Sequence, residues 1–143
     1  MQRIRATRSI SILIAGALVI GSLLGMGLER ALIAQQPGLT RTILQRTDDP
    51  GSSKYEVVMA LAQIPPGASS GKHRHPGVEV AYVLEGSVVV EREGLPTETH
   101  SAGTAFKNEG VVHSAKNTGS KPVKIITTYI VEKGKPLAEP VLP

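Results

Sequence analysis

Short runs of apolar and β-branched residues, separated by turn residues, make up the chain from Thr40 onward. The runs that we expect to form strands are Thr40–Arg46, Tyr55–Ile64, Val78–Leu84, Ser87–Glu93, Thr97–His100, Thr104–Lys107, Val111–Lys116 and Val123–Val131. The turn signals recur at the spacing of roughly 8–12 residues that is typical of β-sandwiches and β-barrels. No stretch after residue 35 has the period of a helix. The pattern therefore predicts an all-β domain.

The N-terminal segment has a different pattern, because residues 9–28 contain no charged side chain. A helix of about 20 residues spans roughly 30 Å, which is enough to cross the hydrocarbon core of a membrane. Arg3, Arg5 and Arg8 precede it, as in both membrane anchors and signal peptides. We interpret residues 1–34 as either a signal peptide cleaved after Ala34 or a retained anchor. Both interpretations predict a periplasmic or secreted domain, tethered to the membrane by residues 9–28 if the segment is retained.

The rest of the chain is predicted to form one domain, because 143 residues allow little more. We expect the barrel to occupy residues 39–133. Residues 134–143 contain three prolines and no periodic pattern, so we expect an extended or disordered tail.

Charge and cysteine content exclude several functions. Four arginines and one glutamate precede Gln35, so residues 35–143 carry 12 basic and 11 acidic side chains. No basic run or aromatic stacking platform remains there, and we expect no nucleic-acid partner. The chain has no cysteine, which excludes disulfides, thiolate nucleophiles and cysteine-based metal sites.

Three histidines and one glutamate have the spacing of a metal site. His73 and His75 are two residues apart, so a strand would point both side chains to one face. Glu79 follows four residues later, and His113 lies in a separate predicted strand. Three imidazoles and a carboxylate suit a divalent transition metal such as Fe, Mn, Ni, Zn or Cu, with positions left for water or substrate. The sequence does not select among these metals.

The same residues carry a resemblance to the cupin superfamily. The first cupin motif, G-x5-H-x-H-x3,4-E-x6-G, is similar at every position, with Gly67, His73, His75, Glu79 and Gly86. The second motif, G-x5-P-x-G-x2-H-x3-N, matches at Gly110, His113 and Asn117. It departs at its start, where Ala102 stands in place of glycine and Asn108 in place of proline.

The resemblance implies a single-domain cupin of the type-2 conserved barrel kind. It implies a double-stranded β-helix (jelly-roll) barrel, a metal ligand set of His73, His75, Glu79 and His113, and a homodimer. An exported cupin with one mononuclear metal could be a metal-dependent small-molecule enzyme, dioxygenase-like or isomerase-like. It could instead be a non-catalytic protein that binds a metal or small ligand. The sequence identifies no general base and no substrate-fixing arginine, so the catalytic residues and the choice between these hypotheses stay open.

The residues that contact a ligand are less well defined by the pattern. Phe106 and Tyr129 are the aromatic residues that we expect to bind a substrate. The apolar side chains that we expect to join them in lining a small cavity are Val57, Met59, Leu61 and Val111.

Overall fold

The computed structural model describes residues 38–142 of the chain. The predictions for the segment 1–34 therefore lie outside the described residues. Within residues 38–142, no helix is long and apolar enough to span a membrane.

Ten strands form the described domain, and no helix occurs among residues 38–142. Their bounds are β1 Thr40–Asp48, β2 Tyr55–Ile64, β3 His73–Arg74, β4 Gly77–Glu85, β5 Ser87–Arg92, β6 Glu98–Ser101, β7 Ala105–Glu109, β8 His113–Lys116, β9 Val123–Glu132 and β10 Glu139–Pro140. The prediction of an all-β domain is confirmed. Each of the eight expected strands is present, and the two-residue strands β3 and β10 are additional.

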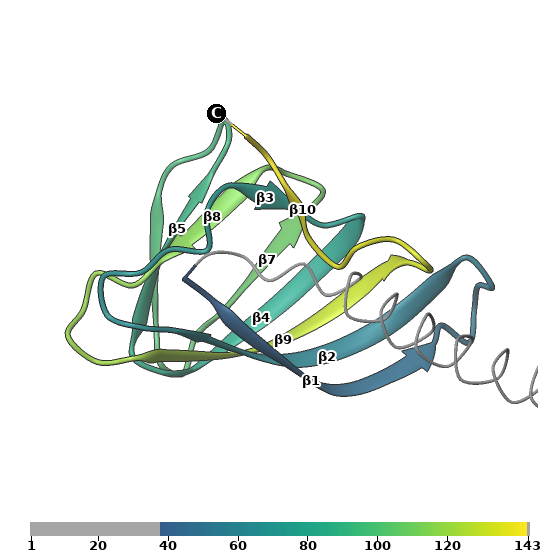
Figure 1. Cartoon of the computed structure of the whole chain (residues 1–143), viewed down its shortest axis with the longest axis horizontal. Coiled ribbons are helices and arrows are strands. Elements are labelled where there is room, and N and C mark those ends of the chain that lie inside the picture. The colour runs from purple at the N-terminus through teal and green to yellow at the C-terminus, as the bar shows by residue number, and fades with distance from the viewer. Residues whose placement is uncertain (1–37, 143) are drawn as a thin grey trace, which may run out of the picture. The chain divides into compact units, whose positions relative to one another are not determined.

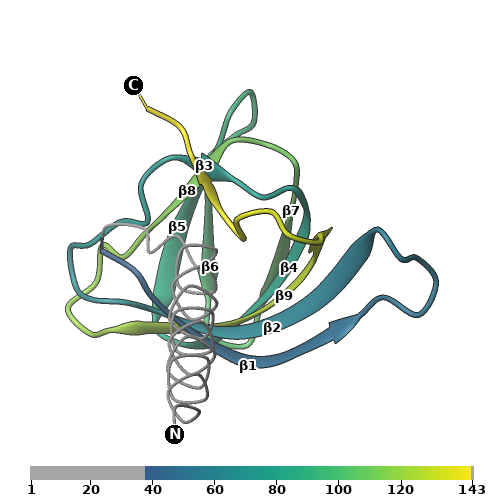
Figure 2. The same ribbon diagram turned by 45° about the vertical axis from the view of Figure 1, so that its right-hand side comes forward.

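The strands form two five-stranded sheets with the orders β1-β2-β9-β4-β7 and β10-β3-β8-β5-β6. All strand pairs in both sheets are antiparallel. Figures 1 and 2 show the sheet of β1, β2, β9 and β4 lying opposite the smaller strands β3, β8 and β5. Strands that are adjacent in space are mostly distant in sequence, so the interior is built from residues all along the domain.

Alternation of side chains explains why these strands bury one face. In β9, the residues from Val123 to Val131 alternate between buried and less buried positions, as a strand with one face in a core requires. Two clusters of buried apolar side chains result. One cluster includes Ile64, Val83, Val88 and Ile125, and the other includes Val58 with Tyr129.

Glycine is required at both ends of β4. Gly86 joins β4 to β5 with a φ of 81°, in the left-handed region that glycine adopts without strain. Gly77 follows Pro76 at the start of β4, where a Cβ atom would clash with the carbonyl oxygen of Ile130. This close approach between β4 and β9 brings the chain back directly after His75, so that Glu79 returns toward the histidines.

The sequence pattern predicted the wrong inward-pointing side chains for strand β2. Val57, Met59 and Leu61 of β2 do not line the interior; Met59 is 40% exposed, and the other two are half-buried. The alternate residues Val58 and Ala60 are completely buried instead. The segment is apolar on both faces, so its pattern does not indicate which face lies inside.

The C-terminal residues pack on the barrel. In Figure 2, the yellow C-terminal segment crosses in front of β3. Strand β10 pairs with β3, with Glu139 opposite Arg74 and Pro140 opposite His73. Leu137 and Ala138 are buried. The segment predicted as an extended or disordered tail thus contributes a short strand beside His73.

Candidate metal centre

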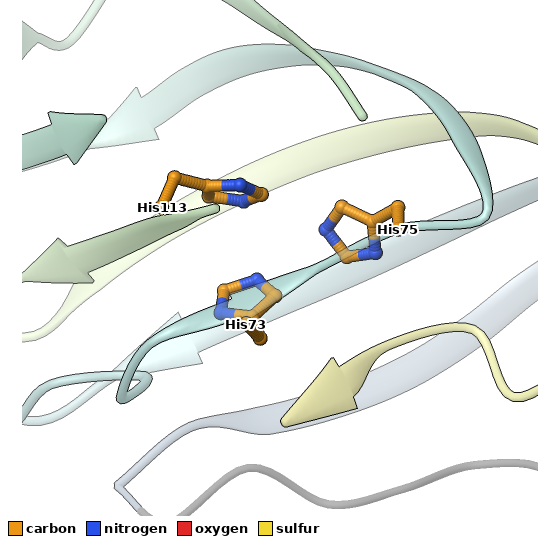
Figure 3. Close-up of side chains that lie close together, drawn as sticks. All are labelled: His73, His75 and His113. Carbon is orange, nitrogen blue, oxygen red and sulfur yellow. The ribbon is translucent and has the colours of Figure 1, made fainter. Parts of the chain in front are cut away.

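Three histidines converge inside the barrel. His73 lies in β3, His75 follows directly after it, and His113 begins β8. His73 and His113 are paired across the two strands, and all three side chains are buried. One ring nitrogen from each lies within 4.8 Å of the others, a grouping that could hold a metal ion. Figure 3 shows the three rings gathered around a common space.

Backbone carbonyl groups fix which nitrogen each histidine offers. The Nδ1 atoms of His73 and His113 lie 3.0 Å from the Gly71 carbonyl oxygen and 2.9 Å from that of Val111. The Nδ1 atom of His75 lies 2.5 Å from the Leu137 carbonyl oxygen. A carbonyl oxygen only accepts hydrogen bonds, so each Nδ1 carries the proton and each Nε2 offers a lone pair. Metal-binding histidines are commonly oriented by this kind of backbone contact.

Glu79 places its carboxylate beside two of these nitrogens. Its Oε2 atom lies 3.5 Å from Nε2 of His75 and 3.4 Å from Nε2 of His113. Nε2 of His75 is buried and has no hydrogen-bond partner. Three lone pairs and a carboxylate in one buried space repel one another unless a cation lies between them. The residues present therefore fit a metal ion, and the binding of that ion by Glu79 stays a prediction.

Burial sets the protonation of the site. The pKa of His73 is lowered from 6.5 to about 3, first by burial and then by the neighbouring His113. Burial alone would raise the pKa of Glu79, whereas a proton on Nε2 of His113 or His75 holds it well below its usual range, and a metal ion in that place would act in the same direction. The site thus presents a neutral His73 imidazole and an ionised Glu79 carboxylate, which are the forms that bind metals.

An inner cavity of about 20 Å³ adjoins the histidines, and its lining includes Arg41, His73, Glu79, His113 and Tyr129. The Tyr129 ring lies 4.8 Å from that of His75 between centroids. Burial, followed by the Glu79 charge, raises the pKa of the Tyr129 hydroxyl. Phe106 also lines this cavity. Both aromatic residues of the prediction lie at the site, and their contact with a substrate stays a prediction.

Val111 was expected to line the same space but lies elsewhere. It borders an outer cavity of about 400 Å³, together with Arg92, Glu98 and His100. Phe106 and Asn108 line both cavities and therefore stand between them.

Arg41 is the functional candidate that sequence reasoning missed. It is 7% exposed, and its guanidinium carbon lies 5.5 Å from the centre of the Tyr129 ring. A signal for it exists, because Leu39, Arg41 and Ile43 share one face of a strand, and two of the three are apolar. Arg74, in contrast, is exposed and pairs with Glu139 at 2.9 Å, so it points away from the site.

Comparison with known proteins agrees with this architecture. Residues 60–129 match the family model described as Cupin domain. An oxalate-binding protein of Thermotoga maritima is 31% identical over 75 residues, which are 52% of this chain and 62% of that protein.

Solved structures show the same fold. A structure of oxalate oxidase has a TM-score of 0.60 and 21% identity, covering 73% of this chain and 55% of that one. A double-stranded β-helix protein of Klebsiella pneumoniae has a TM-score of 0.57 and 21% identity. The match covers 77% of this chain and 88% of that one. The chain thus spans less than two thirds of the oxalate-binding protein and of the oxalate oxidase. Residues 60–129 of the barrel thus form a cupin domain.

Proposed function

We propose that the protein binds a small carboxylate anion at a single divalent transition metal, and that oxalate is the first candidate ligand. The observation that carries this proposal is the presence of Arg41 in the same inner cavity as His73, His113 and Glu79. His73, His75, Glu79 and His113 would hold the metal. The Thermotoga maritima relative, which is named for oxalate binding, supports the choice of ligand.

The charges around the inner cavity favour an anion. Glu79 and Arg41 are the acidic and basic side chains among its described lining residues, and they offset each other when no metal is bound. A divalent metal would raise the local charge to about +2, and charge buried without compensation is costly. A dianion between metal and guanidinium would neutralise it, and arginine is well suited to bind carboxylates.

The size of the cavity limits the ligand. A single water molecule needs roughly 10–15 Å³ of such space, so a cavity of about 20 Å³ holds one or two water-sized groups, and oxalate binding requires the lining side chains to move apart. Oxalate is the smallest dicarboxylate. Phe106 and Tyr129 would form the aromatic walls against which it packs.

Binding is the leading role, and metal-dependent turnover is the second. Among the described cavity residues, Tyr129 has a raised pKa and Glu79 a lowered one, so neither is suited to act as a general base near neutral pH. Four protein ligands nevertheless leave positions on a transition metal for exogenous molecules. Such a metal supplies Lewis-acid or redox chemistry, which supports dioxygenase-like or isomerase-like turnover as the alternative.

We further propose that residues 1–34 export the barrel to the periplasm or exterior, as a cleaved signal or as an anchor formed by residues 9–28. The charge-free stretch supports this proposal. Mass analysis of the native protein distinguishes the two forms, because only the anchor leaves Met1 in place. Retention of the protein in the cytoplasm would contradict both.

Titration of the metal-loaded protein with oxalate tests the proposed function. We expect saturable binding that is tighter than that of acetate. Charge-assisted hydrogen bonds contribute about 1.5–3 kcal/mol, so Arg41→Met should weaken oxalate binding by roughly 10- to 150-fold. The matched control is Arg74→Met, because Arg74 is an exposed arginine between the metal-ligand candidates His73 and His75 in the sequence. Equal affinity in the wild type and Arg41→Met would contradict the proposal.

Oxygen uptake by the iron- or manganese-loaded protein in the presence of oxalate tests turnover. Uptake that depends on both oxalate and metal would establish the enzymatic alternative. Binding without uptake would support the binding role against a dioxygenase-like reaction.

A further inference from the structure

Asn108 occupies the position where the second cupin motif has proline, and it contacts the site directly. It lies in β7, opposite Glu79 in the paired strand β4, and is 2% exposed. Its Nδ2 atom donates a hydrogen bond to Oε2 of Glu79 at 2.6 Å. Its Oδ1 atom accepts a hydrogen bond from Nε of Arg92 at 2.7 Å.

The orientation of this amide follows from its two neighbours. The guanidinium of Arg92 has only donors, and the ionised carboxylate of Glu79 has only acceptors. Asn108 must therefore turn its oxygen toward Arg92 and its nitrogen toward Glu79. A proline at this position could make neither contact, and an aspartate would place a second negative charge beside Glu79.

Arg92 is itself held in place. Its side chain is 7% exposed, and its Nη1 atom donates a hydrogen bond to Oε2 of Glu98 at 2.8 Å. Its guanidinium carbon lies 6.0 Å from the centre of the Phe106 ring. The hydrogen bonds thus run without a break from Glu79 through Asn108 and Arg92 to Glu98, at the border of the outer cavity.

We propose that Asn108 is a positioning residue that, together with Arg92, fixes the carboxylate of Glu79 as the fourth metal ligand. The inference rests on the metal centre of the proposed function. Asn108 holds the same oxygen that lies 3.4–3.5 Å from two histidine nitrogens, so it sets where this oxygen meets the ion. Arg92 acts through Asn108, because it fixes the orientation of the amide.

Cobalt(II) titration of the metal-free protein tests this role, with binding and visible absorption as readouts. Asn108→Leu keeps a similar volume and removes both hydrogen bonds. Loss of such supporting contacts typically weakens metal binding 10- to 100-fold, and we expect this shift with an altered cobalt spectrum. Lys107→Gln is the control, because Lys107 is the exposed neighbour in β7 and pairs only with Glu109 among the described residues.

A double-mutant cycle separates positioning from a general effect on stability. Arg92→Met should weaken cobalt binding in the same direction, and the double variant Arg92→Met/Asn108→Leu should bind no more weakly than Asn108→Leu alone. Additive losses would contradict action of Arg92 through Asn108. If Asn108→Leu does not fold, Arg92→Met decides the question alone.

Two negative results have different meanings. A wild type that binds no cobalt, iron, manganese, nickel, copper or zinc would overturn the metal centre and this inference together. A wild type that binds cobalt, with unchanged affinity and spectrum in the variants, would overturn the positioning role alone.

Discussion

His73 and His113 face each other across the β3–β8 pair, with ring centroids 4.2 Å apart. The two residues are 40 positions apart in sequence, and each turns its Nδ1 atom to a carbonyl two residues before it. The strand pairing therefore aims both Nε2 atoms into the barrel. This arrangement is compatible with neutral imidazoles around a cation, and it has consequences that can be measured.

Acid should destabilise the metal-free protein. The pKa of His73 is about 3 in the folded state and 6.5 in the unfolded state, so between these values only the unfolded chain binds a proton there. Stability is then lost as pH falls below 6.5, by at most about 1.4 kcal/mol per pH unit for one proton. The lowered pKa of Glu79 adds a loss in the same direction below pH 4.5.

Urea denaturation of the metal-free protein between pH 7 and 4 measures this loss. The unfolding free energy should fall steadily, and His73→Phe should reduce the slope. The control His100→Gln alters a histidine at the outer cavity and should leave the slope unchanged. A denaturation midpoint that does not change with pH would contradict the assignment of His73 as a buried neutral imidazole.

The C-terminal segment should support metal binding through His75. The Leu137 carbonyl oxygen accepts the Nδ1 proton of His75, and the Val141 amide donates to the Lys72 carbonyl oxygen at 2.9 Å. Truncation after Lys135 removes both contacts and should weaken metal binding by about 10- to 100-fold. Isothermal titration, with circular dichroism to confirm folding, measures the change. Truncation after Val141 is the matched control, and equal losses in both truncations would contradict the role of Leu137.

The homodimer that the family resemblance implies stays a prediction, and we expect its interface on the outer face of the sheet β1-β2-β9-β4-β7. Large apolar side chains are exposed there, namely Leu44, Met59, Val80, Tyr82, Leu84 and Ile130. Val80 and Met59 both lie opposite Thr128, so the patch crosses three strands. Exposed apolar patches of this kind commonly mark interfaces.

Charge on this face should separate the subunits. We expect the wild type to sediment as a dimer and Val80→Glu/Tyr82→Glu to sediment as a monomer, because a buried unpaired carboxylate is costly. Leu95→Glu, at an exposed position in the turn between β5 and β6, should leave the dimer intact. A monomeric wild type at micromolar concentration would contradict the prediction.

The sequence predicted the strands well because most of them bury one face only. In β9, alternation and β-branching agree, and the expected segment Val123–Val131 differs from the strand by one residue. In β2 both faces are apolar, since the outer face carries part of the exposed patch. The pattern therefore located this strand correctly but assigned its two faces wrongly.

The sequence predicted the site residues only where they lie close together along the chain or match a motif. His73, His75 and Glu79 are close in sequence, and their spacing already indicates a metal. Arg41 and Asn108 gain their roles from partners on distant strands, Tyr129 for the first and Glu79 for the second. One sequence alone does not show which residues of distant strands contact each other.

Metal content per chain tests the central claim most directly. Elemental analysis of protein purified under metal-replete conditions should find about one divalent transition metal per chain. His113→Ala should remove most of it and lower the melting temperature, because bound metal stabilises the folded state. His100→Ala should retain the full content. A wild type with well below one metal per chain, or a His113→Ala variant with undiminished content, would contradict the metal centre.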